Sequence, residues 1–181
     1  DDVFLLTPAN EVSDHFSYSS DLQYPLLNSD DGVSLERIAF NRPTSDNTNW
    51  HSAAESAGFA TPGYVNSQSE LAMGTEDQFT VETEIFSPDN DGNNDVALFS
   101  WNLSEQGYTG DIRIYDSEGR FVRHLMKGEL LGAEGSISWD GLTDEKQKAS
   151  IGIYVIYFEA FTPGGAMLKN KKTCVLAHSL N

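Results

Sequence analysis

Short runs of alternating apolar and polar residues constrain the fold of this chain more than any other feature of its sequence. Turn-forming residues separate these runs about every ten positions, and helical periodicity is nearly missing. The sequence therefore predicts an all-β sandwich rather than βαβ units, with a helix of a turn or so only at 52–57. The expected strands include VFLL (3–6), SLERIAF (34–40), TVETEIF (80–86), VALFSW (96–101), DIRIYD (111–116), RFVRHL (120–125), SISWD (136–140), IGIYVIYFEAF (151–161) and AMLKNKKTCVLA (166–177).

The longest run, 151–161, is apolar at both odd and even positions. A strand that is covered on both faces belongs in the middle of a sheet, so we expect this strand to be central. By contrast, DIRIYD alternates strictly and leads through DSEG (116–119) into its hairpin partner, with Asp116 and Gly119 suited to the first and last turn positions.

The chain of 181 residues is long enough for one ordinary domain or two small ones. Residues 1–78 carry thirteen acidic and two basic residues, whereas residues 79–181 carry fifteen and nine. The polar stretch SQSELAMGTEDQ separates these two portions. We therefore predict a first β module over 1–68, a linker over 69–78 and a second β-sandwich over 79–181.

The formal net charge of −17 bears on possible partners. It argues against nucleic acid, whose phosphates require basic side chains, and against docking on anionic lipid. No apolar run reaches the roughly 18 residues of a membrane span, so direct membrane insertion is not expected. The charge suits an extracytoplasmic protein that can hold hard cations. The single cysteine, Cys174, lies in an apolar run and is expected to be a small buried hydrophobe.

The stretch FSPDNDGNND (86–95) is the best candidate for a binding site. It places Asp89, Asp91, Asn93 and Asp95 at every second position, and their oxygens converge if the backbone curls. An EF-hand loop begins in this way, and the pattern predicts a possible Ca²⁺ site. The chain departs from that loop at position twelve, which is Ser100 instead of a bidentate Glu. Water and a distant acid, Asp116 or Asp140, are the candidates to complete the ion's shell.

Two other interpretations of the same stretch need no calcium. Asp and Asn side chains cap their own backbone in polar turns without any ion, and this alternative stays open. A phosphate loop is excluded, because the stretch has one Gly, no Lys and negative charge facing the phosphate.

The first module contains the segments DDVFLL, EVSDHFSY, GVSLERI, the pair Asn49-Trp50 and ATPGYVNS. With these segments it resembles the C-terminal half of the lamin-tail family, an immunoglobulin-like sandwich found on bacterial surface proteins and in nuclear lamins. The resemblance implies no catalytic residues, and it implies a sandwich that is incomplete at its N-terminus. From the residues alone, Trp50 is expected to anchor an irregular loop, and Pro62-Gly63 to form a type II turn.

The second module contains, in this order, FSPDNDGNND, GDIRIYDSEGRFVRHL, SISWDG and IGIYVIYFEAF. With these motifs it is similar to the immunoglobulin-like domain related to the flagellar hook-capping protein. It is also similar to the gliding-motility-associated C-terminal domain of surface proteins in bacteria that use type IX secretion. The final KNKKTCVLAHSLN lacks the very terminal basic tail that is usual in type IX sorting signals. Apart from the resemblance, Trp139 is expected to be a core plug and Asp140-Gly141 a turn.

No sequence pattern indicates a reaction. The four histidines are scattered and are interpreted as surface residues, and no GxSxG elbow is present. We expect a non-catalytic C-terminal region of a larger secreted or cell-surface bacterial protein, associated with the outer membrane. It would act as a spacer, display or secretion/attachment module. The expected partners are upstream domains of the same protein and outer-membrane or secretion-machinery proteins. The alternative is an accessory module that binds carbohydrate or an outer-membrane protein, for which an exposed row of Trp101, Tyr108 and Tyr115 would be the signature. From the sequence, each of these three is more simply a core or cross-strand residue.

Overall fold

The computed structural model describes residues 1–74 and 76–178, and nearly all of its regular structure is β, as predicted. No helix in this described part of the chain has the length and apolar character needed to span a membrane. The strands are β1 (Asp2–Leu6), β2 (Val12–Ser17), β3 (Leu35–Arg37), β4 (Trp50–Ser52), β5 (Gln78–Val81), β6 (Ile85–Phe86), β7 (Ala97–Asn102), β8 (Thr109–Asp116), β9 (Phe121–Leu130), β10 (Glu134–Trp139), β11 (Gly152–Phe161) and β12 (Met167–Leu176). Single 3₁₀ turns are η1 (Ser20–Leu22), η2 (Asn47–Asn49), η3 (Glu55–Ala57) and η4 (Glu70–Ala72), of which η3 falls on the predicted turn of helix.

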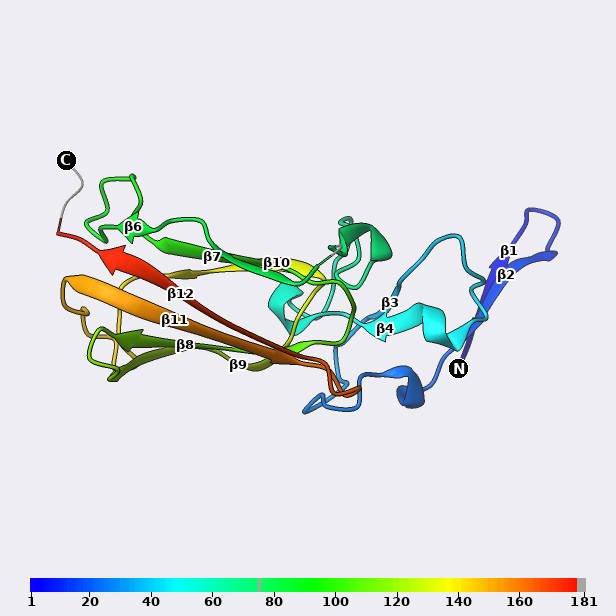
Figure 1. Ribbon diagram of the computed structural model, residues 1–181. Coiled ribbons are helices and arrows are strands. Elements are labelled where there is room, and N and C mark those ends of the chain that lie inside the picture. The colour runs from blue at the N-terminus through cyan, green and yellow to red at the C-terminus, as the bar shows by residue number, and fades with distance from the viewer. Residues whose placement is uncertain (75, 179–181) are drawn as a thin grey trace.

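The second module is a two-layer β-sandwich (Figure 1). One sheet has the order β10-β7-β5, and the other has the order β6-β12-β11-β8-β9, with β6 parallel to β12 and the remaining pairs antiparallel. The alternating runs place their apolar residues between these layers, where eighteen buried side chains form one core. The predicted sandwich over 79–181 is therefore present in the described residues of that range.

Trp139 fills the core as the sequence predicted. Its side chain is fully buried, and its ring lies 5.4 Å from that of Phe86 and 4.8 Å from that of Tyr154, measured between ring centroids. The indole Nε1–H donates to the carbonyl oxygen of Leu142 over 2.8 Å, so burial leaves its donor satisfied. Because β10, β6 and β11 supply these three rings, Trp139 joins the two sheets at the end of the sandwich that carries the acidic loop.

The run 80–86 forms two strands instead of one. Residues up to Val81 pair with β7 in the three-stranded sheet, and Ile85 begins the pairing with β12 in the other sheet. Between them the chain crosses from one layer to the other, with the Glu82 N–H donating to Leu98 O and Glu84 O accepting from the Val175 N–H. Because this segment pairs with both sheets, it connects them along one edge of the sandwich, where each sheet would otherwise present an unpaired strand.

Strand β11 is central, as predicted, but only one of its faces is covered. It pairs with β12 on one side and with β8 on the other. Tyr154, Ile156, Phe158 and Ala160 are buried in the core, whereas Ile153 on the opposite face is 54% exposed. The expectation of burial on both faces is therefore wrong, because the three-stranded sheet packs on one side of the five-stranded sheet and no described residue forms a third layer.

The first module consists of two short antiparallel ladders, β1-β2 and β3-β4, joined by irregular segments. The β1-β2 hairpin projects from the far end of the molecule (Figure 1). Trp50 holds it there, because its ring stacks on Phe16 at 3.9 Å while its Nε1–H donates to Thr44 O over 2.9 Å. Trp50 is thus the predicted anchor, and the incomplete sandwich that the resemblance implies for 1–68 stays a prediction.

Polar side chains occupy much of the interior of the first module. The fully buried Asn49 accepts from the Ala39 N–H and donates to Ala39 O, both over 2.9 Å, and so replaces a pair of ladder hydrogen bonds. Glu36 is 4% exposed, and its carboxylate accepts from the Thr61 hydroxyl and from both the N–H and the hydroxyl of Ser67. A module with few large apolar side chains therefore depends on satisfied polar contacts for its shape.

The two modules meet through a continuous set of hydrogen bonds. Ser67 O accepts from the Ala133 N–H over 2.8 Å, and the buried Gln68 donates to Leu131 O over 3.0 Å. From the other side, the Tyr24 hydroxyl lies 3.0 Å from Gly107 O. Within the predicted linker, 69–78, the Gly74 N–H donates to Leu103 O over 2.9 Å. The segment therefore lies against the sandwich, and the predicted domain limits remain a proposal.

Candidate metal site

The loop between β6 and β7 curls because three of its residues adopt left-handed backbone conformations. Asn90, Gly92 and Asn94 have φ values of 62°, 86° and 51°. Glycine and asparagine tolerate this region better than other residues, which explains their place in the sequence. The left-handed positions alternate with the acidic ones, so successive turns of the backbone bring the acidic side chains to the same side.

Three of the predicted ligands come together in this loop. Asp89, Asp91 and Asp95 each offer a carboxylate oxygen, and these oxygens all lie within 4.8 Å of one another. Asp89 and Asp91 are exposed and Asp95 is half-buried. Oxygen ligands at this spacing, open to solvent on one side, are close enough to hold one metal ion and leave room for water to complete its shell.

The same carboxylates also hold the loop backbone. Asp95 accepts from the Asn90 N–H over 2.6 Å and from the Gly92 N–H over 2.9 Å. Asp89 accepts from the Asp91 N–H over 3.2 Å. These hydrogen bonds are the ones that the polar-turn alternative requires, and they use some of the lone pairs of the carboxylate oxygens. The remaining lone pairs are available to an ion.

Asn93 and the distant acids stand apart from the three-carboxylate group. Asn93 is exposed in the same loop, and its N–H donates to Asp91 over 2.8 Å, so its amide oxygen as a ligand remains a prediction. Neither of the proposed completing acids joins the group: Asp116 is paired with Arg120 at 2.7 Å, and Asp140 caps the Leu142 N–H. Ser100 donates to Glu82, which follows the neighbouring strand β5.

The structure also contributes a loop residue that the sequence analysis overlooked. Ser87 is fully buried, its N–H donates to Asn94 O over 2.9 Å, and its hydroxyl lies 3.4 Å from Asp89 Oδ2. It ties the two ends of the loop together beneath the acidic group. Its position beside Pro88 in FSPDNDG was the available signal.

The aromatic row expected of a carbohydrate-binding module is not formed. Trp101 and Tyr108 are 3% and 2% exposed, and Tyr115 is half-buried. Their polar atoms are directed to protein partners, with Trp101 donating to Gly132 O and Tyr108 to Asp77 Oδ2. The alternative function thus loses the feature that would have favoured it.

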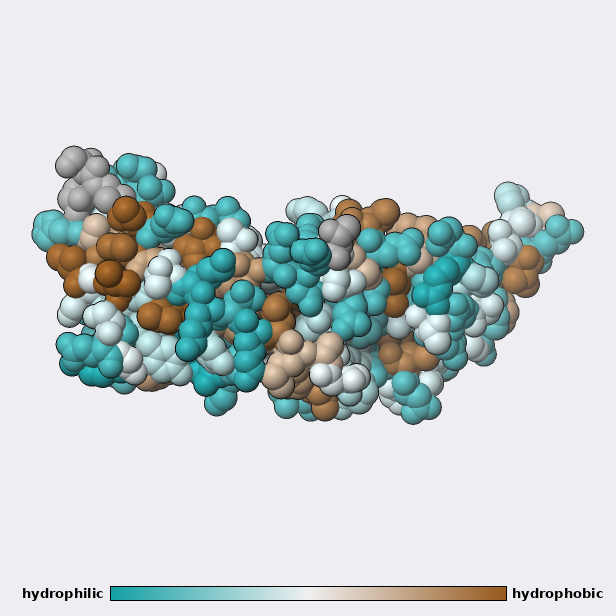
Figure 2. All heavy atoms as spheres, viewed as in Figure 1, coloured by the Kyte–Doolittle hydropathy of each residue, from teal (hydrophilic) through white to brown (hydrophobic). Residues whose placement is uncertain are grey.

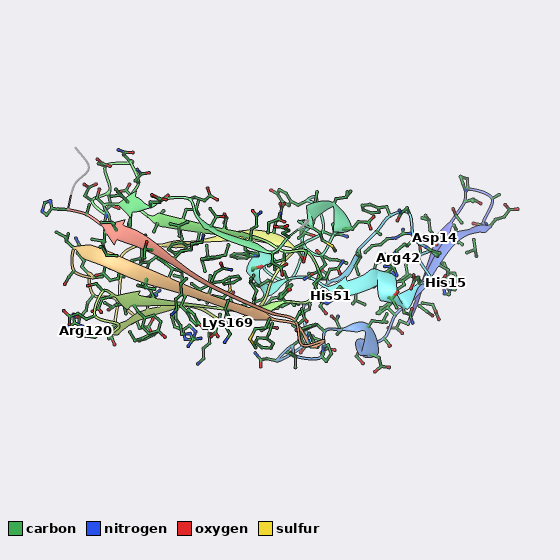
Figure 3. All side chains as sticks on the ribbon, viewed as in Figure 1. Asp14, His15, Arg42, His51, Arg120 and Lys169 are labelled. Carbon is green, nitrogen blue, oxygen red and sulfur yellow. The ribbon has the colours of Figure 1, made fainter. Side chains whose placement is uncertain are left out.

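The residues that could act as nucleophiles or bases lie in structural contacts. Cys174 is buried in the sandwich core, and desolvation raises the pKa of its thiol to about 12, so it remains protonated at neutral pH. His124 is bound to Asp111 at 2.7 Å on a sheet surface. His51 was expected to be a surface residue, and this expectation is wrong. It lies at the junction of the modules (Figure 3), and its ring is 5.4 Å from that of Tyr24.

We expect the junction around His51 to weaken on mild acidification. Burial lowers the pKa of His51 below its ordinary value of 6.5, because the charged ring is poorly solvated. The unfolded chain therefore binds a proton at higher pH than the folded chain, and stability falls as the pH drops from about 6.5 through the lowered pKa. Urea unfolding between about pH 7 and pH 5 should show this loss, and the His51→Gln variant should show less of it; equal slopes would contradict the assignment.

No protein-family model matches the sequence, and no curated protein matches it either. Among solved structures, latent PorU from Porphyromonas gingivalis is 18% identical with a TM-score of 0.43, covering 59% of this chain and 10% of PorU. FlgD from P. aeruginosa is 19% identical with a TM-score of 0.39, covering 60% of this chain and 80% of FlgD. PorZ, a surface component of the type IX secretion system of P. gingivalis, is 13% identical with a TM-score of 0.35, covering 74% of this chain and 14% of PorZ. The chain spans about a tenth of PorU, and likenesses this low assign neither a family nor a function.

Fold and loop together define the class of molecule. It is an all-β protein whose two-sheet sandwich carries, at one end, an exposed loop of three clustered carboxylates able to hold a metal ion. A smaller, polar β module is bonded to its other end.

Proposed function

We propose that this chain is a non-catalytic β region of a larger secreted or cell-surface bacterial protein, where it acts as a spacer, display or attachment module. The observation that carries the proposal is the bonded junction, which joins the two modules into one elongated body (Figure 1). A spacer must hold its ends apart, and a flexible tether between two small sandwiches would not do so. The excess of acid over the whole chain favours solubility outside the cell.

Small-angle X-ray scattering tests the spacer role. A single elongated body gives one well-defined maximum dimension, whereas two modules on a flexible tether give a broad distribution. The variant Gln68→Ala removes the buried hydrogen bond to Leu131 O and should broaden the distribution, while Gln78→Ala, at an exposed residue, should not. A broad distribution for the unmodified chain would contradict the proposal.

The attachment role has its own test. The full chain is fused behind a reporter protein and expressed in a bacterium that uses type IX secretion. Reporter at the cell surface, absent when residues 79–181 are deleted, is the expected result. Reporter that stays inside the cell would restrict the function to spacing and display. This proposal rests on the order of the FSPDNDGNND, IYDSEGR and WDG motifs in the second module.

We propose further that Ca²⁺ binds at Asp89, Asp91 and Asp95, with Asn93 as a fourth candidate ligand, and stiffens the loop. Three carboxylates within 4.8 Å repel one another, and a hard divalent cation is the partner that removes this repulsion best. Calcium at about a hundred times its dissociation constant should stabilise the folded chain by about 2.7 kcal/mol. Thermal unfolding with excess calcium and with chelator measures the difference, and an unchanged midpoint would count against binding.

The variant Asp91→Asn separates calcium binding from simple turn capping. An amide oxygen can still accept the hydrogen bond from the Asn93 N–H, so the loop keeps its cap while it loses one charge. If calcium binds, the variant loses most of the calcium-dependent rise in midpoint. If the loop is only a turn, the variant is neutral or slightly stabilised, because one repulsive charge has gone. Asp140→Asn is the matched control, because the Asp140 side chain caps a different turn at the Leu142 N–H.

A further inference from the structure

The outer face of the five-stranded sheet is more apolar than a solvent-facing sheet surface should be. Antiparallel sheets with one wet face alternate apolar with polar residues, yet β11 places Ile153, Val155 and Tyr157 in succession on its uncovered side. Neighbouring strands extend this strip across the sheet, with Tyr115 beside Val155 and Val175 beside Ile153. We call the strip the outer patch; its members are Ile85, Tyr115, Phe121, Ile153, Val155, Tyr157 and Val175.

The outer patch is bordered by basic side chains, which are scarce in this chain. The ring of Tyr157 has the Arg113 guanidinium 5.4 Å and the Lys171 ammonium 5.6 Å from its centroid. Arg113 and Lys169 are paired with Asp111 and Glu159, so these two cations and two carboxylates balance. None of the ion pairs among the described residues includes Lys171. Lys171 therefore leaves one unbalanced positive charge beside the outer patch, on a chain whose net charge is −17.

The β1-β2 hairpin carries the opposite combination. Its register places Phe4 opposite His15 and Leu6 opposite Val12, on the side away from the Phe16–Trp50 contact. Phe4, Leu6 and Val12 are 54%, 50% and 60% exposed. We call this side the free face of the hairpin. Residues 1–18 contain four carboxylates and no Lys or Arg, so the free face is apolar within an acidic surround.

These two apolar surfaces lie at opposite ends of the molecule. Figure 3 labels His15 on the hairpin at one end, Arg120 in the β8-β9 turn at the other end, and Lys169 on β12 between them. Figure 2 shows apolar surface over the β11-β12 end of the sandwich and again on the hairpin. Since the bonded junction holds the ends apart, a hairpin cannot reach the outer patch of its own chain.

We propose that the free face of the hairpin docks on the outer patch of a second copy of this chain. The two surfaces match in character, since each is apolar, and in charge, since the acidic hairpin meets the basic border at Lys171. The contact is head-to-tail, so every open assembly keeps one free hairpin and one free patch. Such an assembly either grows into a longer chain or closes into a ring. A hairpin covers a small area, so the contact belongs to the weak class below about 1,200 Å² and forms at high local concentration.

Sedimentation of the full chain, from low micromolar to near-millimolar concentration, tests the proposal. The unmodified chain should pass from one-chain mass to dimers and longer species. The hairpin variant, Phe4→Glu with Leu6→Glu, and the patch variant, Ile153→Glu with Lys171→Glu, should each remain monomeric. An equimolar mixture of the two retains one intact hairpin and one intact patch, so it should form dimers that grow no further.

The outcomes are distinguishable. A chain that stays monomeric throughout overturns the proposal, and so does a mixture that fails to dimerise when the unmodified chain associates. A hairpin variant that still associates by itself would also overturn it, since that result indicates a patch-to-patch contact. Leu71 is 74% exposed and belongs to neither the free face nor the outer patch. The Leu71→Glu variant should therefore associate like the unmodified chain. If a glutamate variant unfolds, Phe4→Thr and Ile153→Thr place a residue of high β-propensity at each strand position and make the same comparison.

Discussion

Replacing Trp139 with alanine should lower the free energy of unfolding by about 3–5 kcal/mol, the range for loss of a fully buried large aromatic side chain. The indole is enclosed by Phe86 and Tyr154 and bridges three strands from the two sheets, so the surrounding residues cannot close the gap without moving a sheet. The loss of the hydrogen bond to Leu142 O adds to the cost. Urea unfolding followed by circular dichroism measures the change.

Trp139→Phe is the matched control for this prediction. It keeps an aromatic ring between the sheets but removes the indole Nε1–H, so it should cost clearly less than the alanine variant. Equal losses in the two variants would mean that the hydrogen bond to Leu142, and not the packing of the ring, is the main contribution. A loss below about 1 kcal/mol for alanine would show that the end of the sandwich is loosely packed.

Replacing Glu36 with alanine should destabilise the first module by about 2–4 kcal/mol. The substitution leaves the Ser67 N–H and hydroxyl, which lie 2.8 and 2.7 Å from the carboxylate, without their acceptor in a largely buried setting. It also loosens Ser67, whose carbonyl oxygen accepts from the Ala133 N–H. The effect should therefore spread from β3 to the junction with the sandwich.

Hydrogen exchange measured by mass spectrometry locates this effect. Faster exchange is expected for peptides covering 34–69 and the junction, with little change in β11 and β12. Glu36→Gln keeps one acceptor but presents an amide group to the Ser67 donors, so it should lie between the alanine variant and the unmodified chain. Glu145→Ala, at an exposed residue, is the control. Uniform acceleration over the whole chain would mean that the modules unfold as one unit.

Most strands of the second module could be predicted because their apolar and polar residues alternate. DIRIYD and SISWD give β8 and β10, and the left-handed propensities of Asn90, Gly92 and Asn94 explain why the acidic loop curls. The failures have a common cause. Apolar residues on both sides of β11 cannot show whether a second layer covers each face, and His51 gives no sign of lying at the module junction until Tyr24 is placed beside it. Burial depends on neighbours that are distant in sequence.

The sequence alone determined that the chain is β, where its turns fall, which side chains could gather around an ion, and that its surface is acidic. These are local properties, set by residue type and spacing. Only the tertiary structure decided that 80–86 divides between two sheets, that Ser67 and Gln68 bond the modules together, and that one face of β11 remains uncovered. Each of these depends on contacts between segments far apart in the chain, and such contacts follow from the packing of whole sheets.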